Sequence, residues 1–187
     1  MRRAKGVLAT IGVLVLLAWR GSARAEAPTT QLSVLYGLRW NTGELRERYA
    51  FSYYVIGVEA AYFPRILGQN NVGLSWSIRR NAFDSSSPTN VESELILLDM
   101  GLDLRARVPL ILGPPQVVAY LEGGPLIVRT DIPIPPSSAR SYLGFGVGAG
   151  IEYVLAGRFL ATLGGRFGAL GDPSGLMVFL SLGLAAR

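Results

Sequence analysis

The residues of this sequence that could do chemistry are arginines and carboxylates placed two apart along apolar segments. In LLDMGLDLRARV, Asp99, Asp103, Arg105 and Arg107 alternate with leucine, methionine, alanine and valine. Two nearby carboxylates could carry out general acid–base work. They could equally form ion pairs, because side chains two apart in a β-strand point to the same face. The elements that hold these residues decide between the two readings.

A second candidate is the glycine motif in SYLGFGVGAGIEYVL. Gly144-x-Gly146-x-x-Ala149 has the spacing of a dinucleotide-binding fingerprint, which needs a strand, the glycines and then a helix. Here the apolar alternation continues through the glycines to Leu155 and no helix start follows. We therefore interpret the motif as the glycine face of a strand, where missing side chains leave room for long ones opposite. With no histidine and no cysteine in the chain, we expect no metal and no cofactor.

The elements that must hold these residues show alternation with a period of two, which is the signal of a half-buried strand. Eight such segments are about ten residues long or slightly longer, the length that a tilted strand needs to cross a bilayer. They cover 31–40, 52–62, 72–80, 97–108, 116–128, 141–155, 158–169 and 176–187. Within the fifth segment Pro125 removes one backbone donor, and we expect a bulge there.

This pattern predicts an all-β protein, an eight-stranded antiparallel up-and-down transmembrane β-barrel. The connections after the odd-numbered segments are mostly polar, whereas those after the even-numbered segments are shorter or more apolar. With an even number of strands, this difference places the polar set outside the cell and the other set in the periplasm. No repeat and no second domain is visible in 26–187.

The N-terminal segment has the features of a secretory signal. Met1–Ala25 begins with basic residues, continues with an apolar run over Val7–Trp19 and closes on Ala23-Arg24-Ala25, an A-x-A cleavage site. The apolar run is shorter than a membrane-spanning helix requires. We expect residues 1–25 to be a cleaved signal peptide, with Ala23 and Ala25 at the cleavage site, and residues 26–187 to be the barrel.

Removal of this segment changes the charge balance. Five of the 18 basic residues and none of the 13 acidic ones precede Glu26, which leaves 13 of each in the mature chain. Every basic residue after Glu26 is arginine. A neutral chain offers no electrostatic case for nucleic acid, and a surface without lysine is unusual for a soluble protein.

Alternation alone does not say which face lies inside the barrel. The polar face consists mainly of small residues and balanced charges, which favours an inward polar face and an outward apolar one. The predicted lumen charge network is Arg39, Glu59, Arg79, Asp99, Asp103, Arg105, Arg107, Glu122, Glu152 and Arg166. Aromatic residues near the strand ends predict a girdle at the membrane interfaces. Its members are Trp40, Tyr62, Phe83, Tyr153, Phe159 and Phe167.

The pattern resembles the small outer-membrane β-barrels of the OmpA/OmpX type over essentially all of 26–187. The resemblance is architectural and carries no specific motif. It implies a monomer in the outer-membrane lipid bilayer, inserted by the outer-membrane assembly machinery. Enzymes among such barrels place a catalytic histidine at the rim, and this sequence contains none, so we expect no enzymatic activity.

An eight-stranded barrel is only wide enough for side chains to fill it. We therefore expect a polar lumen plugged by arginine–carboxylate pairs, and a structural or surface-interaction role. The loop TDIPIPPSSAR, at 130–140, could contact an extracellular ligand. Two alternatives stay open: a secreted, soluble, lipocalin-like barrel that holds a hydrophobic ligand on an inward apolar face, and a narrow ion channel along the same lumen residues.

Overall fold

The structure is a computed structural model that describes residues 28–42, 51–66, 70–84, 94–111, 116–132, 138–155, 158–169 and 174–186. The predicted signal peptide, Met1–Ala25, and residues 133–137 of the proline-rich loop lie outside the described residues. No helix in the described ranges is long and apolar enough to cross a membrane.

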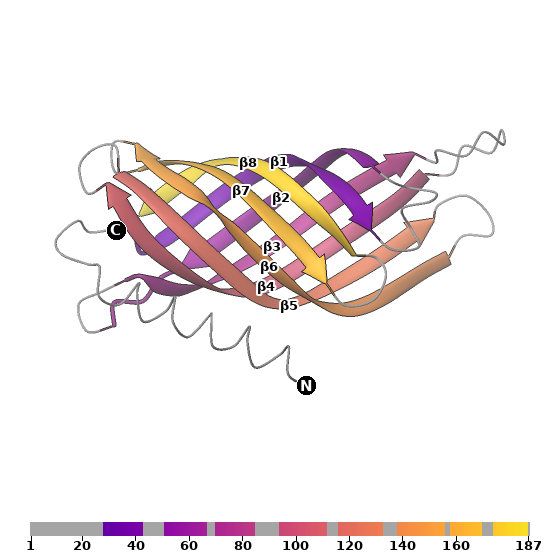
Figure 1. Cartoon of the computed structure of the whole chain (residues 1–187), viewed down its shortest axis with the longest axis horizontal. Coiled ribbons are helices and arrows are strands. Elements are labelled where there is room, and N and C mark those ends of the chain that lie inside the picture. The colour runs from indigo at the N-terminus through magenta and orange to yellow at the C-terminus, as the bar shows by residue number, and fades with distance from the viewer. Residues whose placement is uncertain are drawn as a thin grey trace.

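Eight strands form one closed barrel in which each strand is antiparallel to both neighbours (Figure 1). The strands are β1 (Thr30–Thr42), β2 (Phe51–Tyr62), β3 (Val72–Asp84), β4 (Glu94–Ile111), β5 (Gln116–Ile132), β6 (Ser138–Leu155), β7 (Phe159–Ala169) and β8 (Ser174–Ala186). They follow one another around the barrel in chain order, and β8 closes it by pairing with β1 from Thr30↔Ala186 to Thr42↔Ser174. The predicted all-β, up-and-down antiparallel barrel is confirmed.

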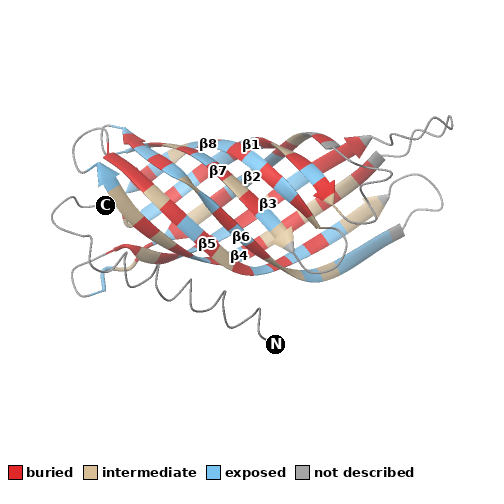
Figure 2. Cartoon of the chain, viewed as in Figure 1, coloured by how far each residue is buried: buried red, intermediate tan, exposed pale blue. Residues whose placement is uncertain are grey.

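The sequence alternation becomes an alternation of burial along each strand (Figure 2). In β1, Leu32, Val34 and Tyr36 are exposed, and they alternate with the buried residues Gln31, Ser33 and Leu35. Most apolar side chains therefore point away from the barrel, and the polar ones point into it. Closure leaves no strand edge unpaired.

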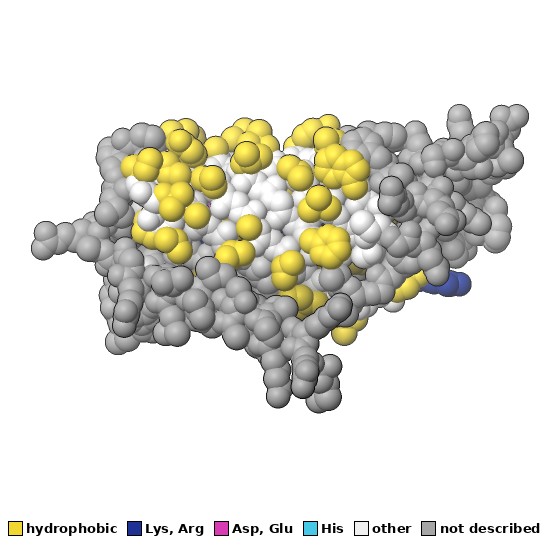
Figure 3. Space-filling model, viewed as in Figure 1, with side chains coloured by type: hydrophobic (Ala, Val, Ile, Leu, Met, Phe, Trp, Pro, Cys, Tyr) yellow, Lys and Arg dark blue, Asp and Glu magenta, His cyan; other side chains and the backbone are white. Residues whose placement is uncertain are grey.

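The exterior is an apolar wall. In the view of Figure 3, hydrophobic side chains are spread over the middle of the barrel, and a basic side chain is visible beyond them at the right-hand end. Leu102, Val147 and Leu182 are 50%, 40% and 63% exposed, whereas Asp103 and Arg166 are buried. An exposed apolar surface of this extent is unfavourable in water but favourable in lipid.

The predicted bulge at Pro125 is wrong. Pro125 pairs with Phe145 of β6, and the register with β4 is the same on both sides of it, at Gly101↔Leu126 and Leu104↔Gly123. The proline removes bonds locally but adds no residue, so the strands stay aligned. The register shifts in the described strands lie between Gly37 and Arg39 in β1 and between Pro109 and Ile111 in β4.

The two ends of the barrel differ. We call the end at which β1 begins and β8 ends the turn end, and the other the loop end. Residues 63–71, 112–115 and 156–158 join strands at the turn end, where Phe63 N donates to Thr29 O and Thr29 N to Ala186 O. The longest strands, β4, β5 and β6 with 18, 17 and 18 residues, project at the loop end (Figure 1).

Candidate functional site

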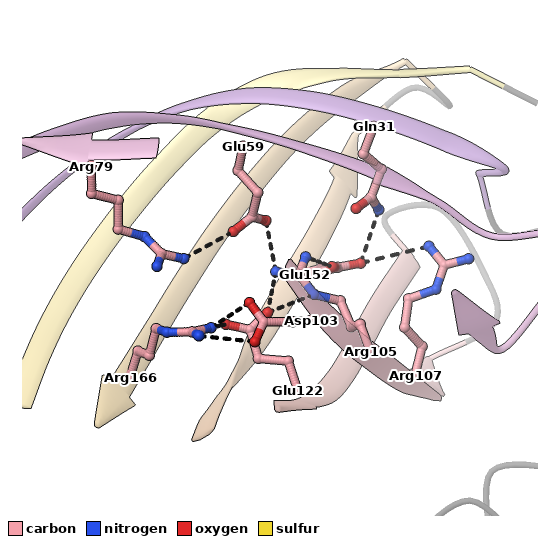
Figure 4. A network of polar contacts seen from close by, with 9 residues as sticks. All are labelled: Gln31, Glu59, Arg79, Asp103, Arg105, Arg107, Glu122, Glu152 and Arg166. Carbon is pink, nitrogen blue, oxygen red and sulfur yellow. Dashed lines mark hydrogen bonds and ion pairs between the residues drawn. The ribbon is translucent and has the colours of Figure 1, made fainter. Parts of the chain in front are cut away.

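The ten charged residues predicted for the lumen all lie on inward positions and are buried, with none more than 7% exposed. Eight of them come from six different strands and are linked in one interior network (Figure 4). Arg39 and Asp99 pair with each other. Each of the ten takes part in at least one ion pair. Five buried arginines therefore face five buried carboxylates inside the barrel.

Arg105 on β4 is the centre of the network. Its guanidinium contacts three carboxylates: Glu59 at 2.7 Å, Glu122 at 2.5 Å and Glu152 at 3.3 Å. It also lies over the ring of Tyr120, 4.4 Å from the centroid. A planar guanidinium with five donors can satisfy several acceptors at once.

Arg166 on β7 binds the carboxylates on the opposite side of the lumen. Its two terminal nitrogens donate to both oxygens of Asp103, at 2.5 and 2.9 Å, and one also reaches Glu122 at 3.2 Å. Glu122 thus joins Arg166 to Arg105. Bidentate pairs of this kind are among the stronger ionic contacts in proteins.

Two further arginines lie nearer the loop end. Arg39 Nη1 donates to Asp99 Oδ2 at 2.5 Å, and its Nε donates to Asn41 at 3.2 Å. Arg79, which is 0% exposed, approaches Glu59 at 3.5 Å and makes no hydrogen bond with any described residue. Asp99 and Asp103 therefore each bind a different arginine.

Arg107 closes the network at the turn end. Its Nη2 donates to the backbone oxygens of Pro28 and Asn70, at 2.9 and 2.7 Å, and its guanidinium lies 3.3 Å from the centroid of Phe63. Its Nη1 is 3.8 Å from Glu152. The Arg107 side chain thus links the segment before β1 to the segment between β2 and β3 through hydrogen bonds inside the lumen.

The glycines of β6 make room for this network. A Cβ on Gly146 would stand 2.7 Å from Cζ of Arg166, and one on Gly148 would stand 2.8 Å from Oε1 of Glu122. A Cβ on Gly150 would stand 2.7 Å from Tyr120. The interpretation of the glycine motif as a strand face that leaves space for long side chains is confirmed.

Sequence reasoning missed the apolar part of the lumen. Near the loop end, β3, β4 and β5 contribute a buried cluster formed by Phe83, Leu95, Leu97, Leu126 and Val128. A second cluster on β1, β2 and β8 consists of Leu35, Val55, Met177 and Phe179. The signal was present, because Leu95 and Leu97 share the phase of Asp99 and belong on the inward face.

Five of the six residues predicted for the aromatic girdle lie on the outer wall, whereas Phe83 does not. Trp40, Tyr62, Tyr153, Phe159 and Phe167 are exposed on the outer wall near strand ends. Phe83 is fully buried in the inner apolar cluster. The alternation of β3 continues without a register shift to Asp84, so Phe83 shares the inward face with Arg79. That the five exposed residues act as a membrane girdle stays a prediction.

Comparison with known proteins supplies the fold class. No family model and no curated protein matches the sequence. Among solved structures, Neisserial surface protein A (NspA) aligns with a TM-score of 0.62 and 16% identity, over 87% of this chain and 99% of that one. Ail, the attachment invasion locus protein of Yersinia pestis, aligns with a TM-score of 0.59 and 14% identity, over 85% of this chain and 99% of that one. The N-terminal β-barrel domain of Pseudomonas aeruginosa OprF aligns with a TM-score of 0.56 and 14% identity, over 85% of this chain and 98% of that one. The chain has the fold of the small eight-stranded outer-membrane β-barrels.

The outer-membrane fold accounts for the apolar exterior and agrees with the predicted location. The lipocalin-like alternative required the apolar face to line the interior, and the exposure of Leu102, Val147 and Leu182 contradicts that requirement. In the part of this barrel that the structure describes, no group of three or more His, Cys, Asp or Glu side chains is placed to hold a metal ion. Three of its glutamates converge on the Arg105 guanidinium.

Proposed function

We propose that this protein is a monomeric outer-membrane barrel with a plugged lumen and a structural or surface-interaction role. The observation that carries the proposal is the mutual neutralisation of the ten buried lumen charges. An ion path would need charged groups that water and permeating ions can reach. Here each charged side chain forms an ion pair with another one, and separating any pair would leave an uncompensated buried charge.

The two ends of the lumen support the same conclusion. Phe63 and Arg107 cover the turn end, where Cζ of Arg107 lies 3.3 Å from the centroid of the Phe63 ring. Buried apolar side chains, among them Phe83 and Leu97, occupy the loop end of the same interior. Ions crossing the barrel would have to pass an apolar section as well as a fully paired charged one.

We also propose that the turn end faces the periplasm and the loop end faces the exterior. Even-stranded outer-membrane barrels keep both strand termini and their shorter connections on the periplasmic side. The projecting ends of β4, β5 and β6 would then stand above the membrane. Two of the similar structures are named as a surface protein and an attachment protein, which is consistent with a role for this exposed end.

The proposal includes no catalytic centre. Asp99 and Asp103 are the carboxylates whose spacing suggested acid–base chemistry, and both are buried and bound to Arg39 and Arg166. A carboxylate held in this way has no access to a lipid or polymer substrate. We infer that these residues stabilise the interior.

Single-channel recording in planar bilayers tests the plug. We expect refolded wild-type protein to show no steady unitary conductance at moderate voltage. The Arg105→Ala variant removes the central guanidinium and leaves three glutamates facing an enlarged space, so we expect it to show cation-selective openings.

Folding of the protein in the same samples is verified by gel electrophoresis, in which the unheated folded barrel migrates faster than the heated, unfolded chain. A steady wild-type conductance that changes its selectivity in Arg105→Ala would establish the ion-channel alternative in place of the plug. A silent wild type beside a conducting variant supports the plug, because it shows that insertion and detection both succeeded.

A further inference from the structure

Two outward-facing arginines lie on one row of backbone pairs near the loop end. Arg80 of β3 pairs with Leu98 of β4, and Leu98 pairs with Arg129 of β5. Directly paired residues in antiparallel strands project from the same face. Both arginines are exposed and Leu98 is partly exposed. With strands about 4.8 Å apart, the two arginine backbones are roughly 10 Å apart. We call Arg80, Leu98 and Arg129 the arginine row.

The arginine row borders the apolar wall. The next outward row towards the turn end consists of Ile78, Met100, Ile127 and Leu143, paired in that order across β3 to β6. Of these, Ile127 and Leu143 are 44% and 76% exposed. The arginines therefore stand where an acyl-chain surface ends and a head-group layer begins, if the barrel sits in a bilayer as proposed.

Neither arginine has a carboxylate partner among the described residues. Arg80 Nη1 donates to the hydroxyl of Tyr54 at 2.7 Å, and its guanidinium lies 6.0 Å from the centre of that ring. Arg129 makes no ion pair in the described part of the chain, although Asp131 is the next outward residue on β5. This differs from the lumen, where every arginine is matched to an acid.

An arginine on the lipid-facing wall is unfavourable unless it lies near an interface and finds an anion. Guanidinium groups bind phosphate oxygens through paired N–H donors. With backbones roughly 10 Å apart and long side chains, the two arginines can reach two phosphate groups of one lipid. The side chains of the apolar row beneath would meanwhile contact the acyl chains of the same lipid.

We propose that the arginine row binds the phosphate groups of an anionic lipid in the outer leaflet. This inference rests on the proposed membrane location and orientation, and it adds a ligand class that the plugged lumen does not imply. Arg80, oriented by Tyr54, supplies one guanidinium and Arg129 the other. Leu98 between them contacts the upper part of the acyl chains.

The test compares wild type with Arg80→Gln/Arg129→Gln, both refolded into phosphatidylcholine vesicles with or without lipid A that carries two phosphates. We expect the phosphorylated lipid to raise the temperature at which the wild-type barrel loses its fast gel mobility. The double variant should lose most of this shift. Its apparent affinity for the lipid should fall roughly ten- to thirty-fold, because each arginine near a charged membrane surface contributes about 1 kcal/mol.

The matched control is Arg140→Gln/Arg158→Gln, which removes the same charge from exposed sites outside the row. Arg140 pairs with Thr130 on the other face of the β5–β6 hairpin, and Arg158 lies at the turn end. We expect this control to keep the wild-type shift. An equal loss in both double variants would mean that net charge acts without a site and would overturn the proposal.

Two further arms separate the remaining outcomes. Inorganic phosphate at the same phosphate concentration should not reproduce the shift, and if it does, the site binds the free anion and the lipid proposal is wrong. Folding of every variant in neutral vesicles tests the membrane location by itself. Failure of the wild type there contradicts the proposed function, whereas folding without lipid discrimination contradicts the arginine row alone.

Discussion

At the scale of single residues, the interior depends on a few arginines that each hold several acceptors. Arg105 alone contacts Glu59, Glu122 and Glu152. Burial of so many charges does not by itself stabilise a fold, because desolvation offsets much of the attraction. Removal of one partner is nevertheless costly, since the charges left behind remain buried without compensation.

We therefore expect Arg105→Met to lower the free energy of unfolding by about 3–5 kcal/mol, the typical cost of breaking a buried ionic group. Urea unfolding of the barrel in detergent, followed by tryptophan fluorescence, measures the change. Arg140→Met, at an exposed site, should change stability by less than about 0.5 kcal/mol. A similarly small effect of Arg105→Met would show that the network contributes little to the fold.

At the scale of elements, glycines allow neighbouring strands to meet where the barrel closes. Gly183 of β8 faces Ser33 of β1, and a Cβ on Gly183 would lie 2.6 Å from the Cβ of Ser33 and 2.7 Å from its Cα. These atoms belong to a paired strand and cannot move aside as the tip of a long side chain can. By contrast, a Cβ on Gly165 of β7 would meet only Met177 O, at 3.6 Å.

Gly183→Ala should accordingly weaken the β1–β8 seam and lower the unfolding free energy by about 1–3 kcal/mol, as overpacking does. Gly165→Ala is the matched control and should be close to neutral. Unfolding midpoints of both variants in the same detergent provide the comparison. Equal midpoints would show that the seam can absorb a methyl group and that Gly183 has no special packing role.

At the scale of the whole molecule, the barrel is inverted relative to a soluble protein. Charged residues fill the centre of its interior, and exposed leucines, valines and isoleucines cover most of its outer wall. Leu180 is the middle residue of β8 and is 52% exposed, whereas Leu110 lies near the turn end of β4 and is 57% exposed. Similar exposure at different heights lets the surrounding medium be tested directly.

In a lipid vesicle we expect Leu180→Arg to cost about 2–4 kcal/mol and Leu110→Arg about 0–1 kcal/mol, because the penalty for a cation depends on its depth in the bilayer. Reversible unfolding from vesicles measures both. Were the barrel to function in water, the two substitutions would have similar and small effects, so the difference between them is the informative quantity.

The sequence by itself determined the number of strands, the face on which each residue lies and the balance of lumen charges. These properties follow from a period-two pattern that is local, so Asp103 and Leu102 could be assigned to opposite faces without knowledge of any neighbour. Phe83 lies inside the barrel because the phase of β3, and not nearness to the strand end, sets the face on which it lies.

Only the tertiary structure decided which arginine meets which acid. Arg166 and Asp103 are 63 residues apart in the chain, and Gln31 and Glu152 are 121 apart. Their contact depends on the register of every intervening strand pair, because a shift in register changes the height at which two inward side chains meet across the lumen. Strand phase is a local property of the chain, whereas height within a closed barrel is a property of all eight strands together.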